Sequence, residues 1–214
     1  MTKTKLMYRF MMIAVMGLII YFIYMNFIKD PGASAFLSHK TGAKRPVQLP
    51  VWLPVMYVHV AFACLAMLTG LINFSRLIWE KRRRVHRWNG YAYLLSVVIV
   101  DVTSGYMAPY ATGGKLTSIA FNQLNAYWLI VTIAALVMAK KKRIDRHRRW
   151  MLRSYVFCFT NVPIHFITWV CYAGVGLSYT VSYTIGVYGA IVLLVLLAEL
   201  IVRTGFKQSG LSNL

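Results

Sequence analysis

The sequence predicts an all-α integral membrane protein in which six transmembrane helices form a single bundle. Apolar residues make up 59% of the 214 residues. They fall into blocks longer than the roughly 18 residues at which a membrane-spanning helix becomes the default interpretation. In hydrocarbon every backbone donor and acceptor must be paired within its own segment, so such blocks form helices. These observations together define the fold class.

Six apolar blocks can span a membrane, and we expect them to form one transmembrane domain covering residues 1–214. The predicted helices lie at residues 7–27, 53–77, 88–109, 118–139, 151–172 and 179–202. The first block resembles a signal peptide because basic residues precede it. Its apolar core is longer than the usual h-region of about 7 to 15 residues, so we expect an uncleaved helix. The 28–52 connection contains three prolines and is expected to be irregular.

Basic residues predict the orientation of the helices, because segments rich in Lys and Arg resist translocation. With the N-terminus inside, 19 of the 24 basic residues lie on the inner side: three at the N-terminus, six at 76–87, eight at 140–153 and two after the last helix. Five lie on the outer side, among them Lys40, Lys44 and Arg45. We therefore expect both termini to be cytoplasmic.

The net charge of +19 would suggest nucleic-acid binding in a soluble domain. Here the charges lie between spans rather than on one folded face, so we expect no nucleic-acid partner. Two basic runs fall where phospholipid headgroups should be. The interaction of each Lys or Arg with an anionic lipid surface is favourable by about 1 kcal/mol. The residues expected at the headgroups are Lys81, Arg82, Arg83, Arg84, Lys140, Lys141, Lys142 and Arg143.

Two similar motifs open the third and fifth predicted helices. HRWNGYAY begins at His86 and HRRWMLRS begins at His147, and each is a His-Arg pair followed by Trp. Two histidines at equal depth can face one another across a bundle, which makes His86 and His147 a second, weaker candidate pair for binding a ligand. Histidine near the headgroups is also often merely solvated.

These motifs, together with His59, resemble a family of bacterial multi-pass membrane proteins labelled domain of unknown function 2306. The resemblance covers the second to fifth predicted helices, and HRRWMLRS is its most specific element. It implies a bacterial plasma-membrane protein and supplies no reaction. The chain departs from the family pattern at Tyr91 and His165, where arginine is common, so a mechanism that needs His165 would not extend to the whole family.

A layer of polar residues is predicted inside the membrane. At about 1.5 Å per residue, His59 lies roughly 10 Å and Asp101 roughly 12 Å below the outer ends of their helices. His165 and Asn125 fall at a similar depth. Ionisable groups so deep in a span are costly and are therefore candidate functional residues. Pro163 is expected to kink the fifth helix and turn His165 toward the bundle axis.

Three functions are compatible with this layer. In the first, His59 and His165 are axial ligands of the iron of one b-type haem in an electron-transfer protein, and Asp101 or Asn125 orients a ligand imidazole. A second haem between His86 and His147 would resemble a cytochrome of the b561 type, although the histidines do not follow that arrangement.

In the second, His59, Asp101 and His165 bind protons or substrate in a small transporter. In the third, an Asp–His hydrogen bond joins helices in a scaffold or assembly protein. The sequence lacks HExxH, GxGxxG, P-loop, CxxC and GxSxG motifs, so metalloprotease, nucleotide-binding and hydrolase functions have no support. It specifies no catalytic residue, and it leaves open whether a homo-oligomer or another membrane protein is the partner.

Overall fold

The structure is a computed structural model that describes residues 3–39 and 46–210, and the regular secondary structure in these ranges is helical throughout. Five helices are long and apolar enough to cross a membrane. A bent pair of shorter helices becomes a sixth span if its two halves cross as one. The predicted fold class is therefore confirmed. Lys40, Lys44 and Arg45, which were assigned to the outer side, lie outside the described residues.

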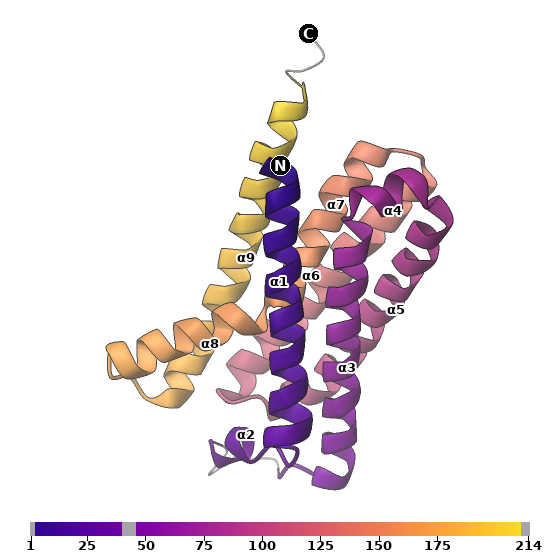
Figure 1. The fold of residues 1–214 in the computed structure, drawn as a ribbon. Helices are drawn as coiled ribbons and strands as arrows, with labels where there is room; N and C mark the ends of the chain where they lie inside the picture. The colour runs from indigo at the N-terminus through magenta and orange to yellow at the C-terminus, as the bar shows by residue number, and fades with distance from the viewer. Residues whose placement is uncertain (1–2, 40–45, 211–214) are drawn as a thin grey trace. The chain divides into compact units, whose positions relative to one another are not determined.

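The chain contains two compact units, Met1–Met107 and Ala108–Leu214. The first consists of α1 (Lys3–Ile23) with its π-helical continuation η1 (Tyr24–Lys29), α2 (Ser34–Ser38), α3 (Leu49–Asn73), α4 (Arg76–Lys81) and α5 (Arg83–Met107). Within this unit α3 packs against α5, and α1 packs against α3 (Figure 1). The short helix α4 contacts both α3 and α5 where the chain turns between them.

Local sequence explains where these helices begin and end. Pro50 lies in the first turn of α3, where its missing N–H costs no intrahelical bond. α5 ends shortly before Pro109, which cannot donate to a helical ladder. Asp30 accepts hydrogen bonds from the Ser34 hydroxyl at 2.7 Å and from the Ala35 N–H at 2.9 Å. These bonds hold the start of α2, a helix within the connection that was expected to be irregular.

The second unit consists of η2 (Ala108–Tyr110), α6 (Gly114–Lys140), α7 (Ile144–Val156), η3 (Phe157–Phe159), α8 (Asn161–Trp169), η4 (Val170–Gly174) and α9 (Tyr179–Gly210). α6 packs against α7, while α8 packs against α9. A small apolar cluster joins α6, α8 and α9 and contains Ala120, Ile164, Val187 and Ala190. Small side chains let membrane helices approach closely, which favours packing where lipid offers no hydrophobic driving force.

The fifth predicted helix, residues 151–172, differs most from the structure. It begins already at Ile144, and it is broken into α7 and α8, which meet at 47°. Pro163 lies in the first turn of α8. Because proline has no N–H, the Phe159 carbonyl receives no bond from that position. The expected kink at Pro163 is therefore present, with η3 between the two halves.

Gly186 fixes the distance between α8 and α9. A Cβ atom at this position would lie 2.8 Å from the Ile164 carbonyl oxygen and would also meet the Thr168 hydroxyl. Real Cβ atoms do not approach a backbone oxygen this closely, so a larger residue would push the two helices apart. The α8–α9 contact therefore depends on glycine.

Candidate functional site

His59, on α3, is hydrogen-bonded to the neighbouring helix α5. Its Nδ1 lies 3.0 Å from the Thr103 hydroxyl oxygen. That hydroxyl also lies 2.7 Å from the Ile99 carbonyl oxygen, to which it can donate. Which of Nδ1 and the Thr103 oxygen donates depends on the tautomer of the imidazole. Within the first unit Thr103, rather than Asp101, is hydrogen-bonded to this imidazole.

Asp101, on α5, is buried and lacks a partner. The residue is 9% exposed, and neither carboxylate oxygen has a hydrogen-bond partner within the described ranges. The chain has only five acidic residues. The other four are placed differently: Asp30 holds α2, Glu80 pairs with Arg76, Asp145 is exposed on α7, and Glu199 pairs with Arg153. Asp101 is therefore a buried carboxyl for which the described part of the chain shows no counter-charge.

The Asp–His hydrogen bond considered for a scaffold does not join Asp101 to His59. Asp101 and Thr103 are two residues apart on one helix, so their side chains point in nearly opposite directions. His59 contacts the side of α5 that carries Thr103. His59 and Asp101 thus have separate surroundings.

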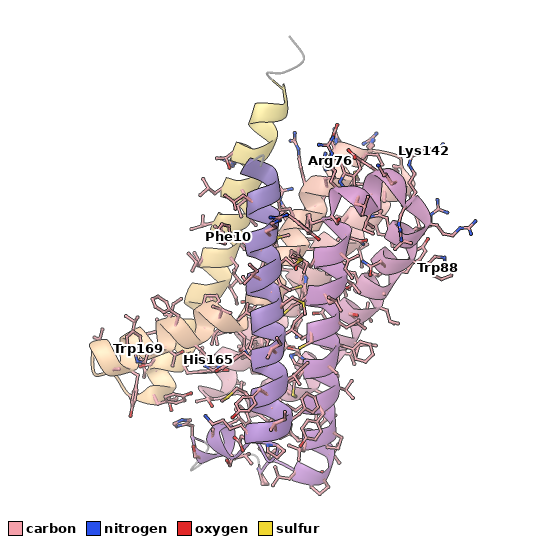
Figure 2. The ribbon with its side chains drawn as sticks, viewed as in Figure 1. Phe10, Arg76, Trp88, Lys142, His165 and Trp169 are labelled. Carbon is pink, nitrogen blue, oxygen red and sulfur yellow. The ribbon has the colours of Figure 1, made fainter. Side chains whose placement is uncertain are left out.

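His165 lies on α8 in the second unit and is exposed, together with Phe166 and Trp169 (Figure 2). The kink does not bury this side chain within the second unit, and its expected turn toward the bundle axis stays a prediction. Asn125, also in the second unit, has a buried side-chain nitrogen without a partner among the residues that are described. Because His59 and His165 belong to different units, their pairing stays a prediction, as does that of His86 with His147.

His86 belongs to a polar cluster that joins α3 and α5. With the Asn73 amide oriented to suit its neighbours, its nitrogen donates to His86 Nδ1 at 3.2 Å and its oxygen accepts from the Gly90 N–H at 3.1 Å. Asn89 also donates to the Thr69 carbonyl at 2.5 Å. The residues of the first motif thus tie the end of α3 to the start of α5.

The second motif joins α7 to two other helices. His147 Nδ1 donates to the Ala135 carbonyl of α6 at 2.9 Å, because a carbonyl can only accept. Ser154 accepts from the Trp128 indole N–H at 3.2 Å and lies 2.6 Å from the Thr132 hydroxyl. Both contacts are made within the second unit, so this motif also has a structural role.

Arg153 links the same motif to α9 through two parallel bonds with Glu199. Its Nε donates to one carboxylate oxygen at 2.5 Å, and its terminal nitrogen donates to the other at 3.1 Å. The guanidinium also lies 4.8 Å from the centre of the Trp150 ring, within range of a cation–π interaction. The spacing of Glu199 and Arg203, four residues apart on α9, would predict an ion pair between these two, but Glu199 makes its bidentate pair with Arg153 of α7.

Both basic runs are exposed at helix ends. Lys81–Arg84 spans the end of α4 and the start of α5, and Lys140–Arg143 spans the turn from α6 to α7. Their positions are compatible with the predicted contact with phospholipid headgroups, which remains a prediction.

Residues 56–202 match the protein family described as "Predicted membrane protein (DUF2306)". The chain belongs to this family. The matched region includes both motifs, so the resemblance inferred from them is confirmed. All the histidines and acidic residues considered above except Asp30 also lie within the DUF2306 region. No curated protein and no solved structure matches the chain.

The structure adds residues to the site that the sequence did not indicate in this DUF2306 protein. Thr103, Asn73 and Thr132 each hydrogen-bond to a predicted residue or motif. Hydroxyls in helices commonly bond to their own backbone, so nothing in the sequence separates Thr103 from other threonines. The distance between paired helices, not a motif, selects these partners.

Proposed function

We propose that the protein is a small proton-linked membrane transporter in which Asp101 takes up and releases the proton. The observation that supports this is the burial of Asp101 within the candidate span Arg83–Tyr110, with no partner for either oxygen in the described chain. An isolated carboxylate is costly in a low-dielectric interior, whereas a protonated carboxyl is neutral and can donate a hydrogen bond. Ionisable residues inside a span commonly mark proton relays.

Two other ionisable groups, His59 and Arg153, are engaged in holding helices together, which favours Asp101 as the titrating group. His59 is bonded to Thr103, and Arg153 is bonded to Glu199. Neither of these contacts gives Asp101 a hydrogen bond or a charge partner. A proton is then the species that most simply changes the charge of Asp101.

An infrared pH titration of the purified protein in lipid nanodiscs tests this assignment. Protonated carboxyls and carboxylates absorb infrared light at different frequencies. The chain has only five acidic side chains, so few groups contribute to either band. We expect a protonated carboxyl band that disappears as the pH is raised and is absent from Asp101→Asn. Asp145→Asn, at an exposed position on α7, is the matched control and should retain the band. If the Asp101→Asn variant still showed the pH-dependent carboxyl band, Asp101 would be excluded as the proton site.

Thermal unfolding of the same variants separates proton transfer from a purely structural role. Asp101 makes no hydrogen bond that Asn would break, so we expect Asp101→Asn to unfold no earlier than the wild type. A scaffold function that relies on the Asp101 carboxyl predicts the opposite, a clear loss of stability.

Binding of b-type haem is a second candidate, favoured by the state of His59. In the tautomer with its proton on Nδ1, His59 would donate to Thr103 and offer Nε2 to an iron atom, and a hydrogen bond at the other nitrogen is typical of ligating histidines. His59 would hold the iron from the first unit, and its pairing with His165 stays a prediction. When bound, haem would supply one-electron chemistry.

The haem candidate is tested by a reduced-minus-oxidised spectrum of protein from haem-supplied cells. We expect a Soret signal that His59→Ala and His165→Ala each abolish and that His86→Ala leaves intact. A flat spectrum in folded protein would exclude haem without bearing on Asp101.

A further inference from the structure

α4, the helix between α3 and α5, carries exposed apolar side chains beside the first basic run. Leu77 is 55% exposed and Trp79 is 38% exposed. Trp88, at the start of α5, is 70% exposed. Figure 2 shows Arg76 and Trp88 at the same end of the first unit, where α4 lies. Apolar and cationic groups therefore occur together on this end.

The charge of this end is almost entirely positive. Glu80 is the acidic residue of α4, and Arg76 neutralises it at 2.7 Å. The remaining cations are all exposed and are Lys81, Arg82, Arg83, Arg84 and Arg87. No acidic residue follows them on α5 before the buried Asp101. This surface is complementary to a layer of phosphates.

We propose that α4 and the start of α5 form a docking surface for anionic phospholipid, independent of any proton transfer at Asp101. We call it the α4 surface and define it by Leu77, Trp79, Lys81, Arg82, Arg83, Arg84, Arg87 and Trp88. The cations contact lipid phosphates, while the apolar side chains insert at the boundary of headgroups and acyl chains. Leu77 and Trp79 are two residues apart and extend from nearly opposite sides of α4, so the apolar groups flank the cations rather than form one face. Exposed apolar and aromatic side chains beside cations anchor helices at the membrane interface.

The apolar side chains distinguish lipid from free phosphate and from a simple topology signal. The second basic run, Lys140–Arg143, has Ile144 as its exposed apolar neighbour and no exposed tryptophan beside it. Attraction by charge alone is screened at high salt, where the Debye length falls to about 3 Å at 1 M. At high salt, anionic lipid should therefore remain bound to the α4 surface while it dissociates from the second basic run, Lys140–Arg143.

Native mass spectrometry of the detergent-solubilised full chain tests this surface with phosphatidylglycerol, phosphatidylcholine and inorganic phosphate as probes. We expect phosphatidylglycerol to bind more tightly than phosphatidylcholine, with about fivefold lower affinity for each cation removed in Arg82→Gln, Arg83→Gln and Arg84→Gln. Lys140→Gln, Lys141→Gln and Lys142→Gln form the matched control and should leave binding at high salt unchanged.

A double variant, Leu77→Ser with Trp79→Ser, keeps every charge and so preserves the topology signal. It should lose phosphatidylglycerol at high salt and retain it at low salt. Equal affinity for the two lipids in the wild type, full displacement by inorganic phosphate, or unchanged high-salt binding in this double variant would each overturn the proposal.

Discussion

The bidentate pair between Arg153 and Glu199 gives the clearest prediction for single side chains. Arg153→Gln removes both bonds and leaves Glu199 without its charge partner. We expect a loss of about 1.5–3 kcal/mol in the free energy of unfolding, the usual value for hydrogen bonds to charged groups. Partial exposure of both side chains keeps this below the cost for a fully buried pair.

Chemical unfolding in detergent measures this loss, and Arg203→Gln is the matched control, with an expected change within about 0.5 kcal/mol. Combining Arg153→Gln with Glu199→Gln should cost less than the sum of the single changes, because no unpaired charge remains. Additive losses would show that the two side chains do not interact.

Gly186 offers a second prediction, based on packing. Gly186→Ala places a methyl group against the Ile164 carbonyl and the Thr168 hydroxyl. We expect a loss of about 1–3 kcal/mol, the usual cost of overpacking. Gly17→Ala on α1 is the control, since a Cβ there meets nothing within 4 Å, and it should cause no loss. Equal melting temperatures for the two variants would contradict the close α8–α9 approach.

Individual candidate residues could be selected from the sequence because ionisable side chains inside apolar blocks are rare and easily seen. Asp101 is such a residue, and its burial agrees with that selection. The partner of His59 could not be selected, because Thr103 is chosen by the packing of α3 on α5. The partner of Glu199 could not be selected either, since the i, i+4 spacing points to Arg203 and carries no information about Arg153 on a neighbouring helix.

The short helix α2 should respond to acid through Asp30. Hydrogen bonds from the Ser34 hydroxyl, the Ala35 N–H and the Ser34 N–H lower the pKa of Asp30 below its ordinary value. The carboxylate therefore stabilises α2 above the ordinary pKa of 3.8, and this contribution is lost as the pH falls through the lower, folded-state pKa. The affected range lies on the acidic side of pH 3.8.

Amide exchange at Ala35, followed by NMR, reports on this contribution. Protection should fall in acid in the wild type. Asp30→Asn keeps a hydrogen-bond acceptor but removes the charge, so its protection should be weaker and independent of pH in this range. A wild-type protection that does not change with pH would contradict the role of Asp30.

Helices were predictable where the apolar blocks were long, and the exceptions have physical reasons. α4 has six residues, too few to show an apolar period within a charged loop. α5 and α7 begin earlier than expected because their first turns are basic, and the hydropathy signal omits such turns although they are helical. Pro163 indicated the kink, but the sequence contained no signal for its size of 47°.

The topology of the whole chain depends on the α7–α8 pair. If the bent pair crosses the membrane as one span, the number of spans is even and both termini lie on the same side, which the basic residues predict to be the cytoplasmic side. If it re-enters on the same side, the termini lie on opposite sides. The bias of basic residues, 19 against five, favours the even number.

Reporter fusions decide between these topologies. We expect a cytoplasmic reporter to be active after residue 204, and a periplasmic reporter to be active after Val175, which follows η4. An active periplasmic reporter at the C-terminus would contradict the six-span arrangement. A fusion in the 140–143 turn, expected to be cytoplasmic in either case, serves as the control.

Contacts between distant parts of the chain were the least predictable feature. Equal depth along separate helices suggested that His59 faces His165 and that His86 faces His147, but depth fixes only one of the three coordinates of a residue. The contacts that the structure does show for His86 and His147 are with neighbouring helices of the same unit. One domain for the whole chain also stays a prediction.

The pair of Arg153 with Glu199 also has a consequence for the order in which the protein is made. The two residues are 46 positions apart, so Arg153 leaves the ribosome well before its partner. Until α9 has been synthesised and inserted, α7 carries a cation that lacks this carboxylate. The second unit therefore cannot be completed before α9 has been made. A ribosome that stalled before residue 199 would leave an incomplete intermediate, which is a substrate for membrane quality-control proteases.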